Sequence, residues 1–451
     1  MTGHFDPARF DEFRFAGRSL ERDGTVTLSY ALGEHRFTER FAIPVPQGGL
    51  PEPAALDGIV ALLHWCAGVS YYKTAAPPRV GFDEPGGVPG PAAAALLEAL
   101  YSEGLGEFAV VNALPALPRP SFGAPPVAPP PPPPRDVARV LVPVGGGKDS
   151  VVALEAVRAA GVPLELFSVR NDAAMQRTEA VAQLPRLVAT RELPLGQLKA
   201  LHEAGARNGH VPITAIVACV AVLTAAANGF DAVALANERS ASQGNQVYDG
   251  VEVNHQFSKS ARAEALLRAA VAEALPQVQL FSILRPASEL AIGRAFARLP
   301  QYHAAFTSCN AIFRLDPQLR AASWCCDCPK CRFVFLILAP FLAPDALHAI
   351  FGRALLDEPA QFDGFALLTA TGGHKPFECV GEEEECLAAI ELLADDPRWA
   401  GGEHVVLRRL IDEVLGARGR DRRRADAALT LSTDHAVPGN LLGAVTDLLG
   451  A

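Results

Sequence analysis

The segment 141–162, LVPVGGGKDSVVALEAVRAAGV, combines the residue types that bind phosphate. An apolar run ends in a short polar loop, and an amphipathic run begins directly after it, so we expect a strand, a loop and a helix. Glycines let backbone N–H groups approach an anion, and a helix N-terminus adds positive potential. A plain strand-to-helix turn does not need three glycines followed by Lys-Asp-Ser. The predicted anion-binding residues are Gly145, Gly146, Gly147, Lys148, Asp149 and Ser150.

Polar residues also follow two other apolar runs, LELFSVRND (164–172) and AVALANERSASQGN (232–245). The carboxyl ends of parallel strands share one edge of a sheet, and ligands bind at that edge. Scattered polar loop residues are the simpler interpretation, but three strand ends show the same change. We therefore expect the ligand site to include Ser168, Arg170, Asn237 and Arg239.

A cysteine cluster, CCDCPKC, occupies residues 325–331. With one cysteine upstream it offers four thiolates for a tetrahedral zinc ion, at Cys309, Cys325, Cys328 and Cys331. A closed four-sulfur site has no room for a catalytic water, so the expected role is structural. An iron–sulfur cluster is the alternative metal group, and Cys326 is the alternative to Cys325.

Composition indicates a globular protein that handles small molecules. The chain has 451 residues, of which 49% are hydrophobic, and a formal net charge of -10, which disfavours broad attraction to nucleic acid. The first residues, MTGHFDPARFDEFRF, lack the apolar core of a signal peptide, and no later segment approaches 18 uninterrupted apolar residues. We expect a cytoplasmic protein without a membrane partner; the oligomeric state stays open.

Changes in sequence texture predict four regions. Alternating strands and a helical run indicate an N-terminal α+β domain (1–118), and the proline-rich segment 119–135 indicates an extended linker. Apolar strands then alternate with helical runs over 136–345, which indicates an α/β domain with a parallel sheet. Residues 346–451 are expected to form a C-terminal α/β extension that completes the substrate site.

The glycine loop resembles a known superfamily motif. GGGKDS is similar to the Ser-Gly-Gly-x-Asp-Ser loop of the PP-loop ATP pyrophosphatases, with Gly145 in place of the first serine. This resemblance implies an adenine nucleotide α-hydrolase-like fold for 136–345, in which the loop grips the departing pyrophosphate and AMP is formed. It also implies Mg²⁺, with Asp149 as the first candidate ligand. The order of the cysteines is similar to that in the 7-cyano-7-deazaguanine synthases, which carry structural zinc.

Longer segments resemble one family more closely. ANERSASQGNQVYDGVEVNHQFSKS (236–260), GGHKPFECVG (372–381), GVSYYKTAAPP and WCCDCPKC are similar to the UDP-N-acetyl-α-D-muramoyl-L-alanyl-L-glutamate epimerases. The resemblance implies ATP-dependent epimerisation of the terminal L-Glu of UDP-MurNAc-L-Ala-L-Glu to D-Glu in peptidoglycan precursor synthesis. The reaction would pass through an acyl-adenylate and release AMP and pyrophosphate. Adenylation removes the carboxylate charge, which makes the Cα proton more acidic.

Such a reaction needs groups that carry protons. Cys379 is the first candidate, because unrelated glutamate racemases use thiols, although a buried structural cysteine has the same sequence signature. His255 and Lys259 are the next candidates, and they would equally suit phosphate binding or pairing with carboxylates. His374 and Lys375 complete the set.

Other interpretations stay open at this point. Another adenylating enzyme, either similar to a 7-cyano-7-deazaguanine synthase or tRNA-modifying, would need the glycine loop and zinc but leaves the terminal regions unexplained. A non-catalytic ATP-binding sensor would hold ATP without turning it over. The arginine run at 418–424 suits either a UDP diphosphate or a solvated face, and GEEEEC (381–386) suits an acidic helix start.

Overall fold

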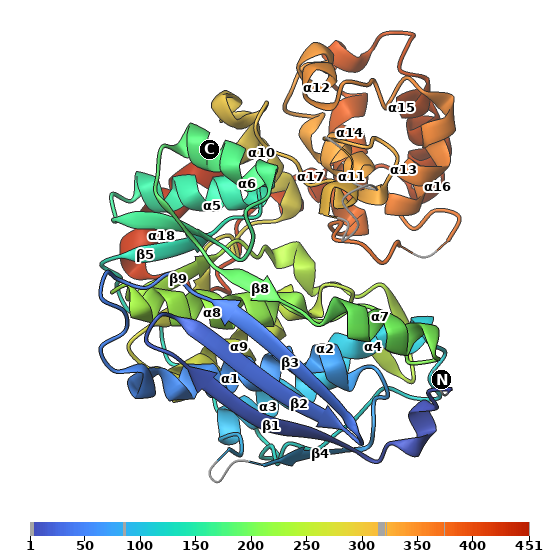
Figure 1. The fold of residues 1–451 in the computed structure, drawn as a ribbon. Coiled ribbons are helices and arrows are strands. Elements are labelled where there is room, and N and C mark those ends of the chain that lie inside the picture. Colours follow the sequence, from blue (N-terminus) through green and yellow to red (C-terminus); the bar gives the residue numbers. More distant parts are fainter. Residues whose placement is uncertain (1–3, 84–86, 314–320, 322, 374, 451) are drawn as a thin grey trace.

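The alternating N-terminal segments form a mixed sheet. The computed structural model describes residues 4–83, 87–313, 321, 323–373 and 375–450 (Figure 1). Strands pair antiparallel over β1 (Glu12–Leu20), β2 (Thr25–Leu32) and β3 (His35–Ala42). β4 (Arg79–Phe82) joins β1 in parallel, and β8 (Thr190–Glu192) joins β3 from much later in the chain. Because β8 follows directly on the last strand of a second sheet, the two sheets are tied together.

The second sheet is parallel throughout and has the order β12-β9-β5-β6-β7. This confirms the predicted parallel α/β arrangement. Counted along the chain its strands have the order 3-2-1-4-5, so the direction of winding reverses between β5 and β9, and ligands bind at such a switch point. The strands are β5 (Val140–Pro143), β6 (Leu164–Ser168), β7 (Arg186–Val188), β9 (Ala232–Leu235) and β12 (Gln279–Ser282).

Helices cover both faces of the parallel sheet. On one face, α8 (Ile213–Ala227) and α9 (Ala261–Ala274) pack on α1 (Asp57–Ala67), and these helices share one apolar core with the N-terminal sheet. On the other face, α5 (Lys148–Ala159), α10 (Glu289–Ala297) and α18 (Gly439–Gly450) belong to a second core with the C-terminal helices. The N-terminal part and the C-terminal helices therefore share apolar cores with opposite faces of the parallel sheet.

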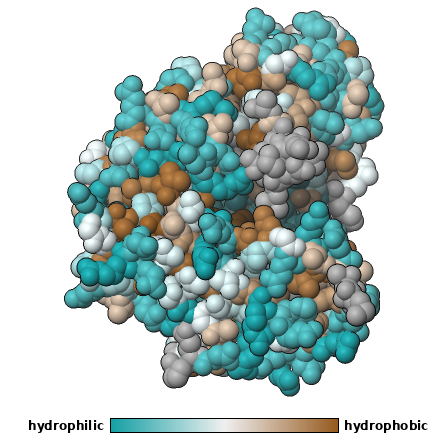
Figure 2. Space-filling model, viewed as in Figure 1, coloured by the Kyte–Doolittle hydropathy of each residue, from teal (hydrophilic) through white to brown (hydrophobic). Residues whose placement is uncertain are grey.

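One helical stretch in the described part of the chain, Pro53–Tyr72, is long and apolar enough to cross a membrane. Its most apolar window is 72% buried inside the molecule, which is the environment of a core helix. On the face drawn in Figure 2, hydrophobic residues form separate patches within a mostly hydrophilic surface.

The proline-rich segment is docked along the molecule. Phe122 is buried, and the backbone N–H groups of Phe122 and Ala124 donate to Glu98 Oε1 at 2.9 and 3.1 Å. Further along, Arg268 of α9 donates to the carbonyl of Pro132 at 2.7 Å. The segment thus lies against α3 (Pro91–Tyr101) and α9 and does not swing free.

The C-terminal region corrects the sequence-based prediction. Residues 346–373 and 375–450 contain helices and no strand, so the expected α/β extension is wrong. A short apolar run such as GFALL suits a buried helix as well as a buried strand, and here it lies in a helix. The helices are α12 (Pro344–Phe351), α13 (Phe362–Leu368), α14 (Glu383–Ala394), α15 (Val405–Arg409), α16 (Gly416–Arg418) and α17 (Arg423–Leu429), followed by α18.

The acidic and arginine-rich segments of this region meet each other. GEEEEC forms the start of α14, where Glu382 and Glu385 make a capping box. Arg418 lies 3.4 Å from Glu384, Arg420 lies 3.3 Å from Asp395, and further arginines of the run pair with the same helix. The arginine run is therefore engaged by carboxylates within the C-terminal region.

Candidate active site

Of the three glycines in the loop, only Gly145 faces open space. Gly146 has φ +83°, and a Cβ there would lie 2.6 Å from Cβ of Ala174 in α6 (Ala173–Ala182). A Cβ on Gly147 would lie 2.8 Å from Ser308 Oγ, whereas a Cβ on Gly145 would meet nothing within 4 Å. Gly147 is the N-cap of α5, and Ser150 Oγ donates to its carbonyl at 2.9 Å. The loop is thus pressed against two neighbours and faces open space at Gly145, beside a helix N-terminus.

Lys148 turns inward from this loop. Its side chain is 1% exposed, and Nζ contacts the carboxylates of Asp149 and Glu289. Burial disfavours the ammonium form, but the two carboxylates outweigh it and raise the pKa of Lys148. Burial raises the pKa of Asp149, but the charges of Lys148 and Lys330 outweigh burial and lower this pKa overall. The start of α5 therefore holds an ion pair whose lysine is buried and whose carboxylate is partly exposed.

A chain of contacts connects Lys148 to Cys379. Glu289 Oε1 lies 3.8 Å from Nζ of Lys330, which is in α11 (Pro329–Leu338). Lys330 Nζ donates to the backbone carbonyl of Cys379. Lys259, at the end of the 3-10 turn η5 (Phe257–Lys259), lies 3.6 Å from Cys379 Sγ. The fold thereby brings together segments that are separated by more than two hundred residues in the sequence.

The environment of Cys379 favours the thiolate. Burial raises the pKa of this thiol, but Lys259, a hydrogen bond with His255 and Lys330 together lower it to about 6. For His255, burial lowers the pKa, and hydrogen bonds with Cys379 and Glu107 raise it to about 9. At neutral pH the site therefore holds a thiolate beside an imidazolium and the ammonium group of Lys259. A thiolate of this kind is able to accept a proton from carbon.

The other predicted ligand residues lie at the carboxyl edge of the sheet. Ser168 Oγ donates to the carbonyl of Arg170 at 2.6 Å, and Arg170 lies 2.9 Å from Asp172. Asn237 donates to Ser282 Oγ at 3.1 Å, which joins the ends of β9 and β12. Arg239 differs, because its guanidinium donates to the carbonyl of Thr430 at 3.1 Å, on the side of the C-terminal helices.

The structure describes one of the two remaining proton-carrier candidates, Lys375. Lys375 is buried, and its Nζ donates to Gln243 Oε1 at 3.3 Å. His374 lies outside the residues that the structure describes.

The four predicted cysteines converge on one point. The sulfur atoms of Cys309, Cys325, Cys328 and Cys331 all lie within 4.8 Å of one another, with separations of 3.8 Å for Cys325–Cys331 and 3.5 Å for Cys328–Cys331. Tetrahedral zinc with Zn–S bonds of about 2.3 Å needs sulfurs roughly 3.8 Å apart, so the set fits a metal such as zinc. Cys326 has φ +58° and its thiol donates to the carbonyl of Phe351, so it points away from this set.

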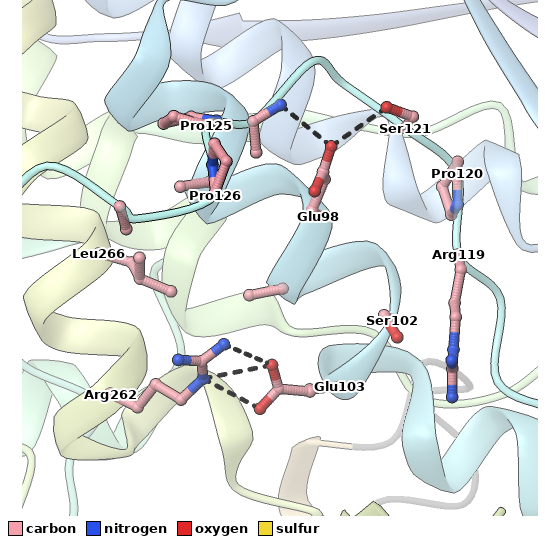
Figure 3. A pocket seen from close by; sticks show the side chains of 14 residues that line it. Glu98, Ser102, Glu103, Arg119, Pro120, Ser121, Pro125, Pro126, Arg262 and Leu266 are labelled. Atoms are coloured by element: carbon pink, nitrogen blue, oxygen red, sulfur yellow. Dashed lines mark hydrogen bonds and ion pairs between the residues drawn. The ribbon is translucent and has the colours of Figure 1, made fainter.

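A cavity of about 430 Å³ lies elsewhere, between α3, the proline-rich segment and α9 (Figure 3). Arg262 pairs there with Glu103 at 2.9 Å, and Glu98 accepts hydrogen bonds from the segment. The predicted site residues do not line this cavity, and these charged groups already have partners.

Comparison with protein families places the chain. Residues 4–283 match the model of the MurL N-terminal domain, and residues 305–425 match the model of the MurL C-terminal domain. The chain belongs to the MurL epimerase family. The MurL match confirms the sequence resemblance, and with it the prediction of an epimerase enzyme. It also accounts for the terminal regions that a 7-cyano-7-deazaguanine synthase would leave unexplained.

Curated relatives support the MurL assignment. A protein of Salinispora tropica is 45% identical over 90% of this chain and 89% of its own length. A Micromonospora protein is 45% identical over 90% of this chain and 91% of its own, and one from Xanthomonas oryzae pv. oryzae is 37% identical over 96% of each. All three are named UDP-N-acetyl-alpha-D-muramoyl-L-alanyl-L-glutamate epimerase. No solved structure matches the chain.

Several charged residues of this site were missed from the sequence. Glu289 follows the end of β12 and so had the same strand-end signal as Asn237. Lys330 lies between two cysteines of the cluster, and its sequence context indicates only a metal site. Glu107 and His210 lie in segments without a motif, and only the fold brings them to His255.

Proposed function

We propose that this protein converts the terminal L-Glu of UDP-MurNAc-L-Ala-L-Glu to D-Glu, using ATP and Mg²⁺ and releasing AMP and pyrophosphate. The product would serve peptidoglycan precursor synthesis. The names of the three relatives and their coverage of 89%, 91% and 96% support the substrate class. The ATP-dependent mechanism rests on the geometry of the site.

The connection between the glycine loop and Cys379 carries this proposal. A carboxylate must be activated and its neighbouring Cα–H must be deprotonated within the reach of one substrate. The contacts Lys148–Glu289–Lys330–Cys379 join an open helix N-terminus to a thiolate through a single layer of buried charges. Two steps of one reaction would thus share one site.

The substrate carboxylate would be activated at the glycine loop. The arrangement of β5, the loop and α5 in a 3-2-1-4-5 sheet supports a PP-loop, adenine nucleotide α-hydrolase-like fold. Gly145, Gly146, Gly147 and Ser150 would cradle the phosphates, with Lys148 adding positive charge, and the substrate carboxylate would attack the α-phosphorus so that pyrophosphate leaves. Asp149 would hold Mg²⁺, which supplies charge neutralisation for the phosphates. Ser168, Arg170, Asn237 and Arg239 would complete the nucleotide side.

The Cα proton would be transferred at Cys379. The Cys379 thiolate would take the Cα proton of the acyl-adenylate, and the electron pair would delocalise into the activated carbonyl. A proton delivered to the opposite face would invert the centre, and water would then release the D-product and AMP. Lys259 and His255 would keep the thiol ionised before the transfer. The zinc that suits the four cysteines would hold the segment containing Lys330 in place and take no part in the chemistry.

A nucleotide and stereochemical assay tests this function. Enzyme, ATP and Mg²⁺ incubated with UDP-MurNAc-L-Ala-L-Glu should yield D-Glu after hydrolysis of the product, together with AMP and pyrophosphate. UDP-MurNAc-L-Ala is the matched control, because it lacks the glutamyl residue whose α-carboxylate would be activated, and it should yield no AMP. An ATP-binding sensor would give neither AMP nor D-Glu, and that result would overturn the proposal.

A further inference from the structure

The N-terminal part of the chain contributes a carboxylate beside His255. Glu107 is in the short helix α4 (Gly106–Val111), and its Oε2 contacts Nδ1 of His255 directly. Only 17% of the Glu107 side chain and 13% of the His255 side chain are exposed. The two residues are 148 positions apart, so the tertiary fold creates this contact.

The same imidazole also meets the thiol. Cys379 raises the pKa of His255, and His255 lowers the pKa of Cys379. Because Glu107 occupies Nδ1, Nε2 is the nitrogen left to face the sulfur. The backbone of His255 is fixed as well, since its N–H donates to Asn245 Oδ1 at 2.9 Å and Asn245 donates to the carbonyl of Pro376 at 2.8 Å. A thiol, an imidazole and a carboxylate in this order are the arrangement in which the third group orients the second.

We propose that Glu107 is a positioning residue that fixes the orientation and protonation of His255, so that the N-terminal part of the chain completes the proton-transfer site around Cys379. The contact of Glu107 with His255, and the hydrogen bond from Gln256 to the carbonyl of Val380 at 3.2 Å, bring the carboxylate, the imidazole and the segment of the thiol together. The use of this arrangement in epimerisation rests on the function proposed above. Glu107 acts through His255 and does not need to touch the substrate.

His210 has a different part in this cluster. Its ring lies beside that of His255, tilted by 42° with 4.5 Å between centroids, and its Nδ1 lies 3.9 Å from Glu107 Oε2. Burial and the charge of His255 lower the pKa of His210 to about 4, so His210 is neutral at physiological pH. A neutral ring covers the imidazolium without competing for the Glu107 charge.

Glu107, His210 and His255 also offer three ligand atoms within 4.8 Å of one another, which is compatible with a metal ion. The contacts favour the triad instead. Glu107 and His255 contact each other as hydrogen-bond partners do, and the electrostatic coupling of His255 with Cys379 gives the imidazole a second partner. A second metal centre is therefore the alternative that the experiment must distinguish.

The charges around the pair support a stable thiolate–imidazolium state. The groups that face Cys379 and His255 from the surrounding elements are Lys259, Lys330, Glu107, His210 and Glu378. With the pKa of Cys379 at about 6 and that of His255 at about 9, both partners are charged between these values. Removing the Glu107 charge should lower the pKa of His255, because an imidazolium is then less stabilised.

Chemical modification of His255 measures the change in its pKa and requires no substrate. Diethyl pyrocarbonate reacts with neutral imidazole, and mass spectrometry of the peptides at pH 7.5 quantifies each histidine separately. In Glu107→Gln, modification of His255 should rise about fivefold or more, since a pKa decrease of roughly one unit multiplies the neutral fraction. Modification of His210, which is neutral in both proteins, should stay unchanged and serves as the internal reference.

Variants and a kinetic readout complete the test. Glu107→Asp keeps the charge and should remain closer to the unsubstituted protein than Glu107→Gln, and Glu103→Gln, which removes a carboxylate paired with Arg262, should have no effect. The high-pH limb of the epimerisation kcat should move to lower pH in Glu107→Gln, whereas ATP–pyrophosphate exchange should persist.

Three results would overturn the proposal. These are unchanged His255 modification in Glu107→Gln, a kcat loss that is equal at every pH, or a second metal ion per chain that disappears in Glu107→Gln and His210→Ala. If the unsubstituted protein shows no epimerisation at all, the proposed function fails, and the modification of His255 still decides the role of Glu107.

Discussion

Buried charges define the site at the scale of single residues. Lys148 and Glu289 are 1% and 3% exposed, and burial acts against the charge of both. Neighbouring carboxylates nevertheless raise the pKa of Lys148, whereas burial and the charge of Asp149 raise the pKa of Glu289. Groups with strongly perturbed pKa values gather at functional sites, and here the perturbation runs from the glycine loop to Cys379. The burial of these charges costs stability unless every partner is present. The cluster is therefore explained better by chemistry than by stability.

Asp149 provides a test of the loop. Asp149→Asn removes the charge beside Lys148 with little change in shape, so substrate-dependent pyrophosphate release should fall on the order of a hundredfold. The melting temperature should fall only modestly, because the buried Lys148 keeps Glu289 as its second carboxylate partner. Glu165→Gln is the matched control, because Glu165 is at the amino end of β6, paired with Arg139 at 2.5 Å. Near-normal turnover in Asp149→Asn would show that ATP does not react at this loop.

The pKa values of Cys379 and His255 predict a bell-shaped pH profile. Cys379 must be ionised to accept a proton, so epimerisation should rise as pH increases through about 6. His255 must stay protonated to hold the thiolate, so the rate should fall as pH increases through about 9. The two apparent values belong to the coupled pair and are measured from kcat/KM against pH. A rate that keeps rising above pH 9 would contradict this assignment.

Sequence alone identified the residues that lie in contiguous motifs. The loop residues, the four cysteines and Cys379 each have a local pattern, and the structure places them at a strand end, around one point and beside Lys259. Glu107 and His210 have no such pattern, because their proximity to His255 is created by packing of the N-terminal helices on the parallel sheet. A single sequence has no record of that packing.

At the scale of elements, two neighbouring glycines in the turn between β5 and α5 should differ in how well they tolerate a side chain. Gly146 has a left-handed φ and is crowded by Ala174, so Gly146→Ala should cost about 1–3 kcal/mol in the free energy of unfolding. Gly145→Ala meets open space and should cost little in stability. Urea denaturation of both variants measures this difference. Equal stability of the two variants would contradict the loop geometry described here.

The cysteine cluster is the second element-scale test. Purified protein should contain about one zinc ion per chain, and replacing Cys328 and Cys331 together by serine should remove it and lower thermal stability. Cys326→Ala is the matched control, because its thiol contacts the carbonyl of Phe351 and lies outside the cluster. Elemental analysis decides the outcome. Iron in place of zinc, or zinc retained after the double substitution, would contradict the prediction.

Element types were predictable where the sequence pattern was long or punctuated. The alternating strands of the N-terminal sheet and the strand–helix alternation around β5 and α5 had clear periods, and both are present. The C-terminal region was predicted wrongly, because its short apolar runs do not separate buried helix from buried strand. Tertiary burial against α10, α11 and one another decides the helical outcome there.

At the scale of the whole molecule, all three parts of the chain meet at one site. Glu107 comes from the N-terminal part, Lys148, His255, Lys259 and Lys330 come from the centre, and Cys379 comes from the C-terminal region. The match to the MurL epimerase family likewise extends over both domains. The docked proline-rich segment contacts both α3 and α9, which pack on each other and join the N-terminal part to the parallel-sheet domain.

Transfer of solvent deuterium tests the central claim most directly. The enzyme, ATP, Mg²⁺ and UDP-MurNAc-L-Ala-L-Glu in D₂O should place deuterium at Cα of the D-glutamyl product, and omission of ATP should abolish the label. Cys379→Ala should lose inversion and label while it retains ATP–pyrophosphate exchange, and Cys66→Ala, at a buried thiol of the N-terminal core, should behave normally. AMP formation without deuterium at Cα, or normal inversion by Cys379→Ala, would contradict the account.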